Sequence, residues 1–204
     1  MKRIVIVFVL FVFSLNAQVF NESDNFVSLG YGIGTRYQNY FSNYQNYKGY
    51  NFSSFGPLNI QYERGFKKIG PGIIGLGGVL SYSSYKATWI QNYYYMYYSS
   101  GYLYDYEYKG RNIQLMFRGA YHYDFGIDNL DFYAGLGVGF SYEREKLKTN
   151  DPYYNSSSVS VSLGSWYRGY VFVGGRYMFT SNLGGYLEVS PGFSALNLGL
   201  TYKL

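Results

Sequence analysis

Apolar residues alternate with small or polar residues along most of the chain after residue 26. Between residues 132 and 142, Phe, Ala, Leu, Val, Phe and Tyr alternate with Tyr, Gly, Gly, Gly and Ser. A period of two is typical of β-strands that have one apolar face and one small or polar face. The same period recurs in eight segments: 27–34, 58–63, 74–82, 112–123, 132–142, 171–179, 187–189 and 195–204. The pattern therefore predicts eight strands and an all-β fold.

The connections between these segments are sorted by length. Short turns rich in Gly, Asn and Asp are expected at 65–70, 124–130 and 180–185, whereas long connections cover 38–52, 87–108 and 144–166; the remaining connection, 191–194, is short. Short turns at one end, long loops at the other and an even strand number are typical of transmembrane barrels. We therefore expect a closed antiparallel up-and-down transmembrane β-barrel of eight strands, after an N-terminal signal peptide.

The polarity of the two strand faces indicates which side meets water. The small-or-polar face is rich in glycine and carries Glu63, Arg118, Arg176 and Glu188. Eight strands enclose just enough room for side chains, so glycines there would make space for longer polar groups. The larger apolar face would then point outward to lipid. A soluble secreted barrel is the alternative: it would hold the apolar face inside and need no detergent.

The N-terminus has the organisation of a secretory signal. Lys2 and Arg3 precede an apolar run, Ile4–Phe13, and a small residue, Ala17, stands at the expected cleavage point. This run is too short to span a bilayer as a helix. We expect residues 1–17 to be a signal peptide and residues 18–204 to form the outer-membrane β-barrel domain.

Charge and cysteine content narrow the possible partners. The chain has 17 basic and 12 acidic residues, and removal of Lys2 and Arg3 leaves 15 basic residues, which is too weak an excess to favour nucleic acid as a partner. There is no cysteine, so neither a disulfide framework nor a cysteine-based metal site is available. We expect no cofactor and no metal.

Four charged residues on the inward face are candidate lumen residues. Arg176 and Glu188 lie at equal distances from Asn182, so a hairpin centred there would place them directly opposite each other. Glu63 and Arg118 are expected to join them in an ion-pair network. This network predicts a structural plug that fills the lumen, and the alternative is an ion pathway.

His122 is the single histidine of the chain and the main candidate for catalysis. With the N-terminus in the periplasm, the strand that carries it runs inward from its long loop, so His122 is expected at the periplasmic end. Enzymes that act on the lipids of the outer leaflet need their histidine at the opposite end. We therefore predict that the protein is not an enzyme and has no catalytic residue.

Tyrosine is concentrated in residues 91–110, where it fills nine of twenty positions. From 105 to 111 the odd positions are charged and the even positions from 102 to 108 are tyrosine, so we expect one hairpin that continues beyond the membrane and turns near 99–101. One interpretation is an aromatic layer that rigidifies this hairpin. The other is an adhesive surface for an extracellular glycan or protein. The residues are Trp89, Tyr93, Tyr94, Tyr95, Tyr97, Tyr98, Tyr102, Tyr104, Tyr106 and Tyr108.

The C-terminus resembles the assembly signal of outer-membrane proteins. Asn197, Gly199, Tyr202 and Leu204 match its pattern, with Leu204 standing where an aromatic residue is usual. Together with the stretch 169–189, the chain resembles small eight-stranded outer-membrane barrels of the OmpA/OmpX type. The resemblance implies an integral protein of a Gram-negative outer membrane whose partners are outer-membrane lipid and the assembly machinery. The expected role is non-enzymatic, in membrane structure and surface contact; the alternative is a narrow channel or small-solute carrier.

Overall fold

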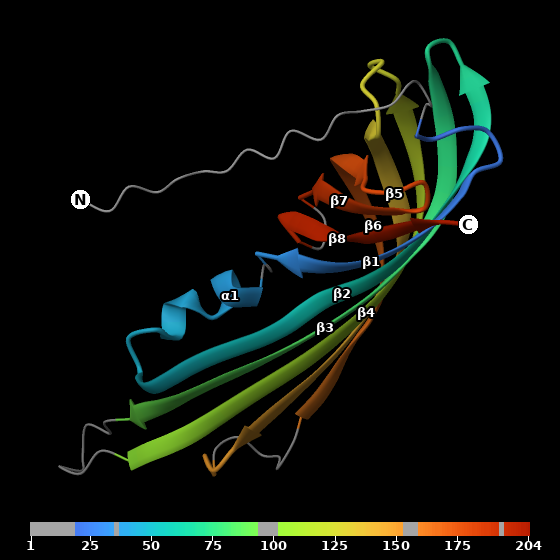
Figure 1. Cartoon of the computed structure of the whole chain (residues 1–204). Helices are drawn as coiled ribbons and strands as arrows, with labels where there is room; N and C mark the ends of the chain where they lie inside the picture. The colour runs from blue at the N-terminus through green and yellow to red at the C-terminus, as the bar shows by residue number, and fades with distance from the viewer. Residues whose placement is uncertain (1–18, 35–36, 94–101, 153–158, 192–193) are drawn as a thin grey trace, which may run out of the picture.

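The computed structural model describes residues 19–34, 37–93, 102–152, 159–191 and 194–204, and these form a closed ring of strands (Figure 1). Every strand pairs antiparallel with the next one along the chain, and β1 closes the ring by pairing with β8. The eight-stranded all-β barrel that the alternation predicted is therefore confirmed. The strands are β1 (Asn25–Ile33), β2 (Lys48–Ile69), β3 (Gly72–Tyr93), β4 (Tyr102–Tyr123), β5 (Leu130–Thr149), β6 (Val159–Met178), β7 (Leu183–Val189) and β8 (Leu196–Lys203).

The wall of the barrel has unequal height. β2, β3 and β4 have 22 residues each and β5 and β6 have 20, whereas β7, β8 and β1 have 7, 8 and 9. Pairing of β1 with β2 ends at Tyr31 and Leu58, and pairing of β6 with β7 ends at Val173 and Val189. Five strands thus continue beyond the closed ring as an open sheet (Figure 1). We call the part of β2–β6 beyond the paired residues Tyr82, Ile113 and Tyr142 the outer sheet.

Two expected long loops are partly strand. β2 begins at Lys48, inside the expected loop 38–52, while β5 reaches Thr149 and β6 begins at Val159, inside the expected loop 144–166. On β5 the added residues alternate between acidic and basic side chains (143–146), so the apolar pattern ended too early there. At the start of β6 the run Val, Ser, Val, Ser and Leu (159–163) does alternate apolar and polar residues, and the prediction missed it. The extended β3–β4 hairpin is confirmed by pairing as far as Tyr93 and Tyr102, and its expected turn, 99–101, lies outside the described residues.

Apolar side chains face outward along the closed part of the barrel, and polar side chains face inward. Leu115 is 49% exposed and Leu200 is 58% exposed, whereas Asn59 and Thr201 are each 1% exposed. From Ile113 to Tyr123, β4 rises roughly 34 Å, or about 26 Å along the barrel axis at a tilt near 40°. We call this outward belt the apolar band; its members include Leu29, Ile60, Leu80, Phe117, Leu136, Phe140, Val171 and Leu187.

Glycines on the inward face give room to rings from other strands. A Cβ atom on Gly30 would lie 1.9 Å from the Tyr186 hydroxyl, and one on Gly110 would lie 2.2 Å from the Tyr85 ring. The expectation that lumen glycines make space is confirmed at Gly30. Other inward glycines make room for other rings as well, such as Phe172 at Gly135 and His122 at Gly75.

Two helical turns cover the inner face of the outer sheet. α1 (Tyr37–Tyr40) and a 3₁₀ turn, η1 (Ser42–Tyr44), follow β1 and lie beside β2 (Figure 1). Tyr37 and Phe41 are buried there against Tyr85 and Trp89. In the part of the chain that the structure describes, no helix has the length and apolar character needed to cross a membrane. The expected signal peptide, residues 1–17, lies outside the described residues.

Candidate functional site

The four predicted lumen residues come together in a buried ion-pair network. Nη1 of Arg118 lies 2.9 Å from Oε2 of Glu188, and Nη2 of Arg176 lies 2.9 Å from Oε2 of Glu63. A longer contact of 3.6 Å joins Arg118 to Glu63. All four residues are buried on the inward face. Because two acids meet two bases there, their charges are compensated inside the barrel wall.

The expected direct pairing of Arg176 with Glu188 is wrong. Glu188 stands opposite Gly174, and Arg176 stands opposite Tyr186. The turn after β6 is shifted by one residue from the expected centre, since Phe179 and Thr180 both donate backbone hydrogen bonds to the Leu183 carbonyl. This moves the pairing by two positions, which keeps both side chains on the inward face. Glu188 therefore finds its partner on the more distant β4, and Arg176 pairs with Glu63 on the more distant β2.

His122 and Asp131 extend the network toward the short turns. Nδ1 of His122 lies 2.9 Å from Asp131, and its Nε2 atom lies 3.5 Å from Glu63. Asp131 also lies 3.4 Å from Arg176. The sequence analysis placed His122 at this end of its strand but missed Asp131. Asp131 lies two residues before Tyr133, so the period of two places both side chains on the inward face, and this pattern could have identified Asp131.

Aromatic rings enclose the charged groups on their remaining sides. The ring of Phe20 stacks on His122 with centroids 3.7 Å apart and planes at 9°. The Arg118 guanidinium lies 3.9 Å from the Phe172 ring, and that of Arg176 lies 4.1 Å from the Phe26 ring. Guanidinium cations are attracted to the faces of aromatic rings, so these contacts stabilise the two buried arginines, which are shielded from bulk water. No alternation precedes β1, so nothing in the sequence pattern indicated Phe20.

The predicted aromatic hairpin is in part a packed inner layer. Trp89 and Tyr106 are buried and stack with centroids 5.4 Å apart and planes at 3°, and Tyr104 and Tyr108 are half-buried against them. We call these residues, with Tyr37, Phe41 and Tyr85, the aromatic layer. The rigidifying interpretation describes these members. The remaining predicted side chains lie outside the described residues: Tyr93, Tyr94, Tyr95, Tyr97, Tyr98 and Tyr102.

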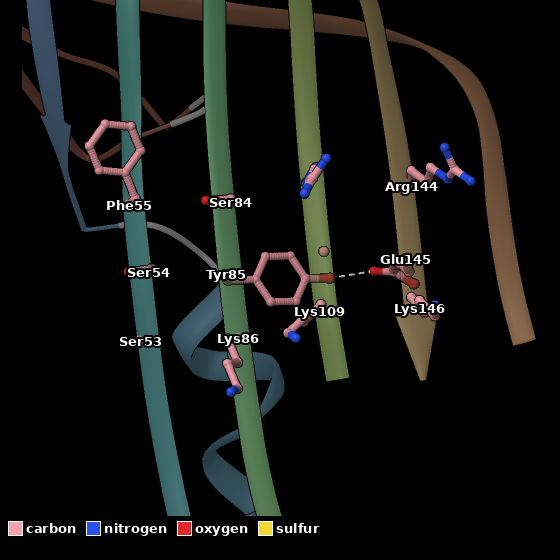
Figure 2. Close-up of a pocket in the computed structure, with 12 residues that line it drawn as sticks. Ser53, Ser54, Phe55, Ser84, Tyr85, Lys86, Lys109, Arg144, Glu145 and Lys146 are labelled. Atoms are coloured by element: carbon pink, nitrogen blue, oxygen red, sulfur yellow. Dashed lines mark hydrogen bonds between the residues drawn. The ribbon is translucent and has the colours of Figure 1, made fainter. Parts of the chain in front are cut away.

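Carboxylates of β5 accept hydrogen bonds from the aromatic layer. Glu145 accepts a 2.5 Å hydrogen bond from the Tyr85 hydroxyl (Figure 2). It accepts a second from the Tyr108 hydroxyl. Glu143 accepts one of 3.2 Å from Tyr37. Burial, followed by the neighbouring Glu145 carboxylate, raises the pKa values of Tyr85 and Tyr108 above their ordinary value. Both phenols therefore stay protonated as donors at neutral pH.

The outward face of the outer sheet carries the opposite charge. Five exposed basic residues line a hollow of about 690 Å³ directly beyond the apolar band (Figure 2). Glu107 lies just beyond this hollow, 2.7 Å from Lys86 and 2.9 Å from Lys109. Hydrogen bonds from Lys109 and Lys86 lower the pKa of Glu107 to about 2. We call the hollow the basic hollow; its cations are Lys86, Lys109, Arg111, Arg144 and Lys146.

The residues of the expected assembly signal divide between the two faces of β8. The Asn59 side chain donates a 2.8 Å hydrogen bond to Asn197 in the interior, and Gly199 lies where a Cβ atom would meet the Leu29 carbonyl at 2.1 Å. Tyr202 and Leu204 are exposed on the outer face. Their recognition by an assembly machinery stays a prediction.

Comparisons with known proteins find matches among solved structures alone. No family model matches the chain, and neither does any curated protein. Among solved structures, the chain is similar to Ail, the attachment invasion locus protein of Yersinia pestis, with 13% sequence identity and a TM-score of 0.41. The match covers 90% of this chain and 100% of that chain. Across the described residues, no group of three or more His, Asp or Glu side chains is placed to hold a metal ion.

Proposed function

We propose that the chain is a non-enzymatic integral protein of a Gram-negative outer membrane. It crosses the bilayer as the closed barrel and presents the outer sheet at the cell surface as a contact platform. The observation that carries this proposal is the polarity of the wall: the apolar band faces outward while the ion-pair network is buried inside. In water this arrangement would expose the apolar band to solvent. In a bilayer the apolar band contacts lipid, while the buried charges pair with one another inside the barrel.

The surface-contact role is supported by the rigidity and the open margins of the outer sheet. The aromatic layer, with Phe52 of β2 and Leu147 of β5 packed against it, joins four of the five long strands to the loop that carries α1. The margin of β2 from Lys48 to Phe55 has no paired β1 residue, and the described backbone of β6 before Tyr170 has no paired β7 residue. Unpaired strand margins and tyrosine-rich tips are both suited to protein or glycan contact.

The alternative role of a narrow channel receives less support from the interior. At the level of Arg118, the cross-section holds the Phe172 and Tyr133 rings together with two carboxylates. Charged side chains that are paired with each other are not available to coordinate a permeating ion. We therefore expect no stepwise conductance when the protein is inserted in a planar bilayer; regular single-channel steps that disappear in Arg118→Met would favour the channel instead.

Heat-modifiability tests the membrane assignment. The chain is folded into mild detergent and run unboiled and boiled on SDS gels, with circular dichroism on the same sample. We expect faster migration of the unboiled form and strand-rich spectra, because a closed barrel resists SDS until it is heated. Protease added to whole cells should cut the outer sheet and leave the barrel strands intact. A chain that stays soluble without detergent and shows no mobility shift would overturn the proposal.

A further inference from the structure

We propose that the basic hollow binds the phosphate-bearing headgroup of a lipid in the outer leaflet. The inference rests on the proposed membrane location, and it adds a ligand class and a site. The hollow is built by neighbouring strands, because Lys86 is paired with Lys109 and Lys109 with Lys146. One step closer to the apolar band, Arg111 is paired with Arg144. Five cations therefore occupy two adjacent rows across three strands.

Alternation on β5 separates the charges by sign. In the run 143–146, Glu, Arg, Glu and Lys follow one another, so the acids point into the aromatic layer and the bases point outward. Glu145 is occupied by Tyr85 and Tyr108 on the far side of the sheet. Glu145 is among the residues that line the hollow, but both of its carboxylate oxygens accept hydrogen bonds from phenols, and the five exposed bases leave the outward face with a net positive charge.

Three of the five cations have no acidic partner within the described part of the chain. Lys86 and Lys109 share Glu107, whereas Arg111, Arg144 and Lys146 make no ion pair with a described carboxylate. Like charges on adjacent strands repel and destabilise a sheet. A bound anion removes this cost, and the planar guanidinium groups of Arg111 and Arg144 are suited to bidentate contact with phosphate.

The position of the hollow favours a lipid over a soluble anion. The row containing Arg111 and Arg144 lies two residues from Ile113 and Tyr142, which begin the apolar band. Phe55 lines the same hollow and is 49% exposed. A lipid whose phosphate meets the arginines would place its acyl chains on the apolar band, so both parts of one molecule are satisfied. A free phosphate would gain only the polar half of these contacts.

Native mass spectrometry of the whole chain in detergent micelles tests the site. The micelles contain a small fraction of phosphatidic acid or, separately, phosphatidylcholine. We expect one phosphatidic acid to be retained, and Arg111→Gln/Arg144→Gln to weaken retention by at least about tenfold, since each lost charged hydrogen bond contributes on that order. Arg111→Lys/Arg144→Lys should keep part of the binding. Glu107→Gln, which frees Lys86 and Lys109, should strengthen it.

The matched control removes two charges from the other end of the barrel. Lys67 and Lys68 are exposed near the turn between β2 and β3, so Lys67→Gln/Lys68→Gln makes the same change in net charge away from the hollow. Equal loss of phosphatidic acid in this control, or unchanged retention in Arg111→Gln/Arg144→Gln, would overturn the site. Competition by free glycerol 3-phosphate at the same concentration as the lipid would overturn the lipid assignment.

The same samples separate this proposal from the proposed function. Unboiled SDS gels of each variant report barrel closure independently of lipid retention. A normal mobility shift without selective lipid retention rejects the basic hollow and leaves the membrane assignment standing. Absence of the shift in the wild-type chain rejects both.

Discussion

The barrel interior and the inner face of the outer sheet lie on the same strands but accommodate buried polar groups differently. In the interior, carboxylates meet arginines, as Glu188 meets Arg118. In the outer sheet, carboxylates meet phenols, as Glu145 meets Tyr85, and the bases stand on the opposite face. The closed ring can bring partners from any strand across the lumen, whereas the open sheet offers only its neighbours and one covering helix. Closure therefore permits ion pairs to form across the lumen, while the open sheet uses neutral donors.

Removing one charge from the interior should give the largest effect. Arg118→Met leaves Glu188, which is fully buried, without its cation. Breaking a buried pair in this way costs about 3–5 kcal/mol. Urea unfolding of the protein in lipid vesicles, followed by tryptophan fluorescence, measures the loss. The double variant Arg118→Met/Glu188→Leu should recover most of it; equal loss in both variants would contradict the role of this pair.

Opening the aromatic layer should have a smaller and local effect. Phe41 contacts Phe52, Tyr85 and Trp89, so Phe41→Ala leaves a gap that the surface loop can partly close, at a cost of about 2 kcal/mol. Limited proteolysis should cut residues 38–47 faster, while the heat shift of the barrel stays unchanged. Tyr40→Ala is the control, since Tyr40 is 67% exposed. A lower barrel unfolding temperature would mean that the two regions are not independent.

Alkaline pH should loosen the outer sheet before the barrel. Tyr85 and Tyr108 have raised pKa values in the folded state, so their contribution is complete below about pH 10, where unfolded tyrosine ionises, and is lost as the pH rises further. Absorbance at 295 nm and proteolysis follow the two regions. Glu145→Gln keeps an acceptor without the charge and should let both phenols ionise at lower pH. If the barrel loosened at the same pH as the outer sheet, the two regions would not respond to pH independently.

Glu107 should give the smallest effect. Its two lysine contacts are exposed and screened by water, so Glu107→Gln should cost only a few tenths of a kcal/mol. The lowered pKa means that the contribution is present above the ordinary value of 4.5 and is lost as the pH falls toward about 2. Urea unfolding at pH 7 and pH 2, with and without 0.5 M salt (about a 4 Å Debye length), measures it. A cost that persists in salt would point to a packing role.

Alternation predicted the face of each residue better than its partner. Glu63 and Arg118 were placed correctly on the inward face because side chains alternate strictly along a strand. The partner of Arg176 was not predictable, since it depends on which residues close one turn. Phe20 precedes the first alternating segment, so the sequence pattern could not predict its contact with His122. Burial of Trp89 depends on Phe41 and on Tyr44 of η1, a three-residue 3₁₀ turn with no periodic signal.

In the proposed membrane location, the unequal strand lengths have a consequence for the surrounding bilayer. From Leu183 to Val189, β7 rises roughly 20 Å, or about 16 Å along the axis once tilted, against the ~25 Å apolar belt usual for such barrels. Lipids beside β7 and β8 must therefore shorten or bend, whereas lipids beside β3 and β4 keep their normal length. This hydrophobic mismatch is confined to one flank. The protein should thin the membrane asymmetrically and favour neighbours that prefer a thin patch.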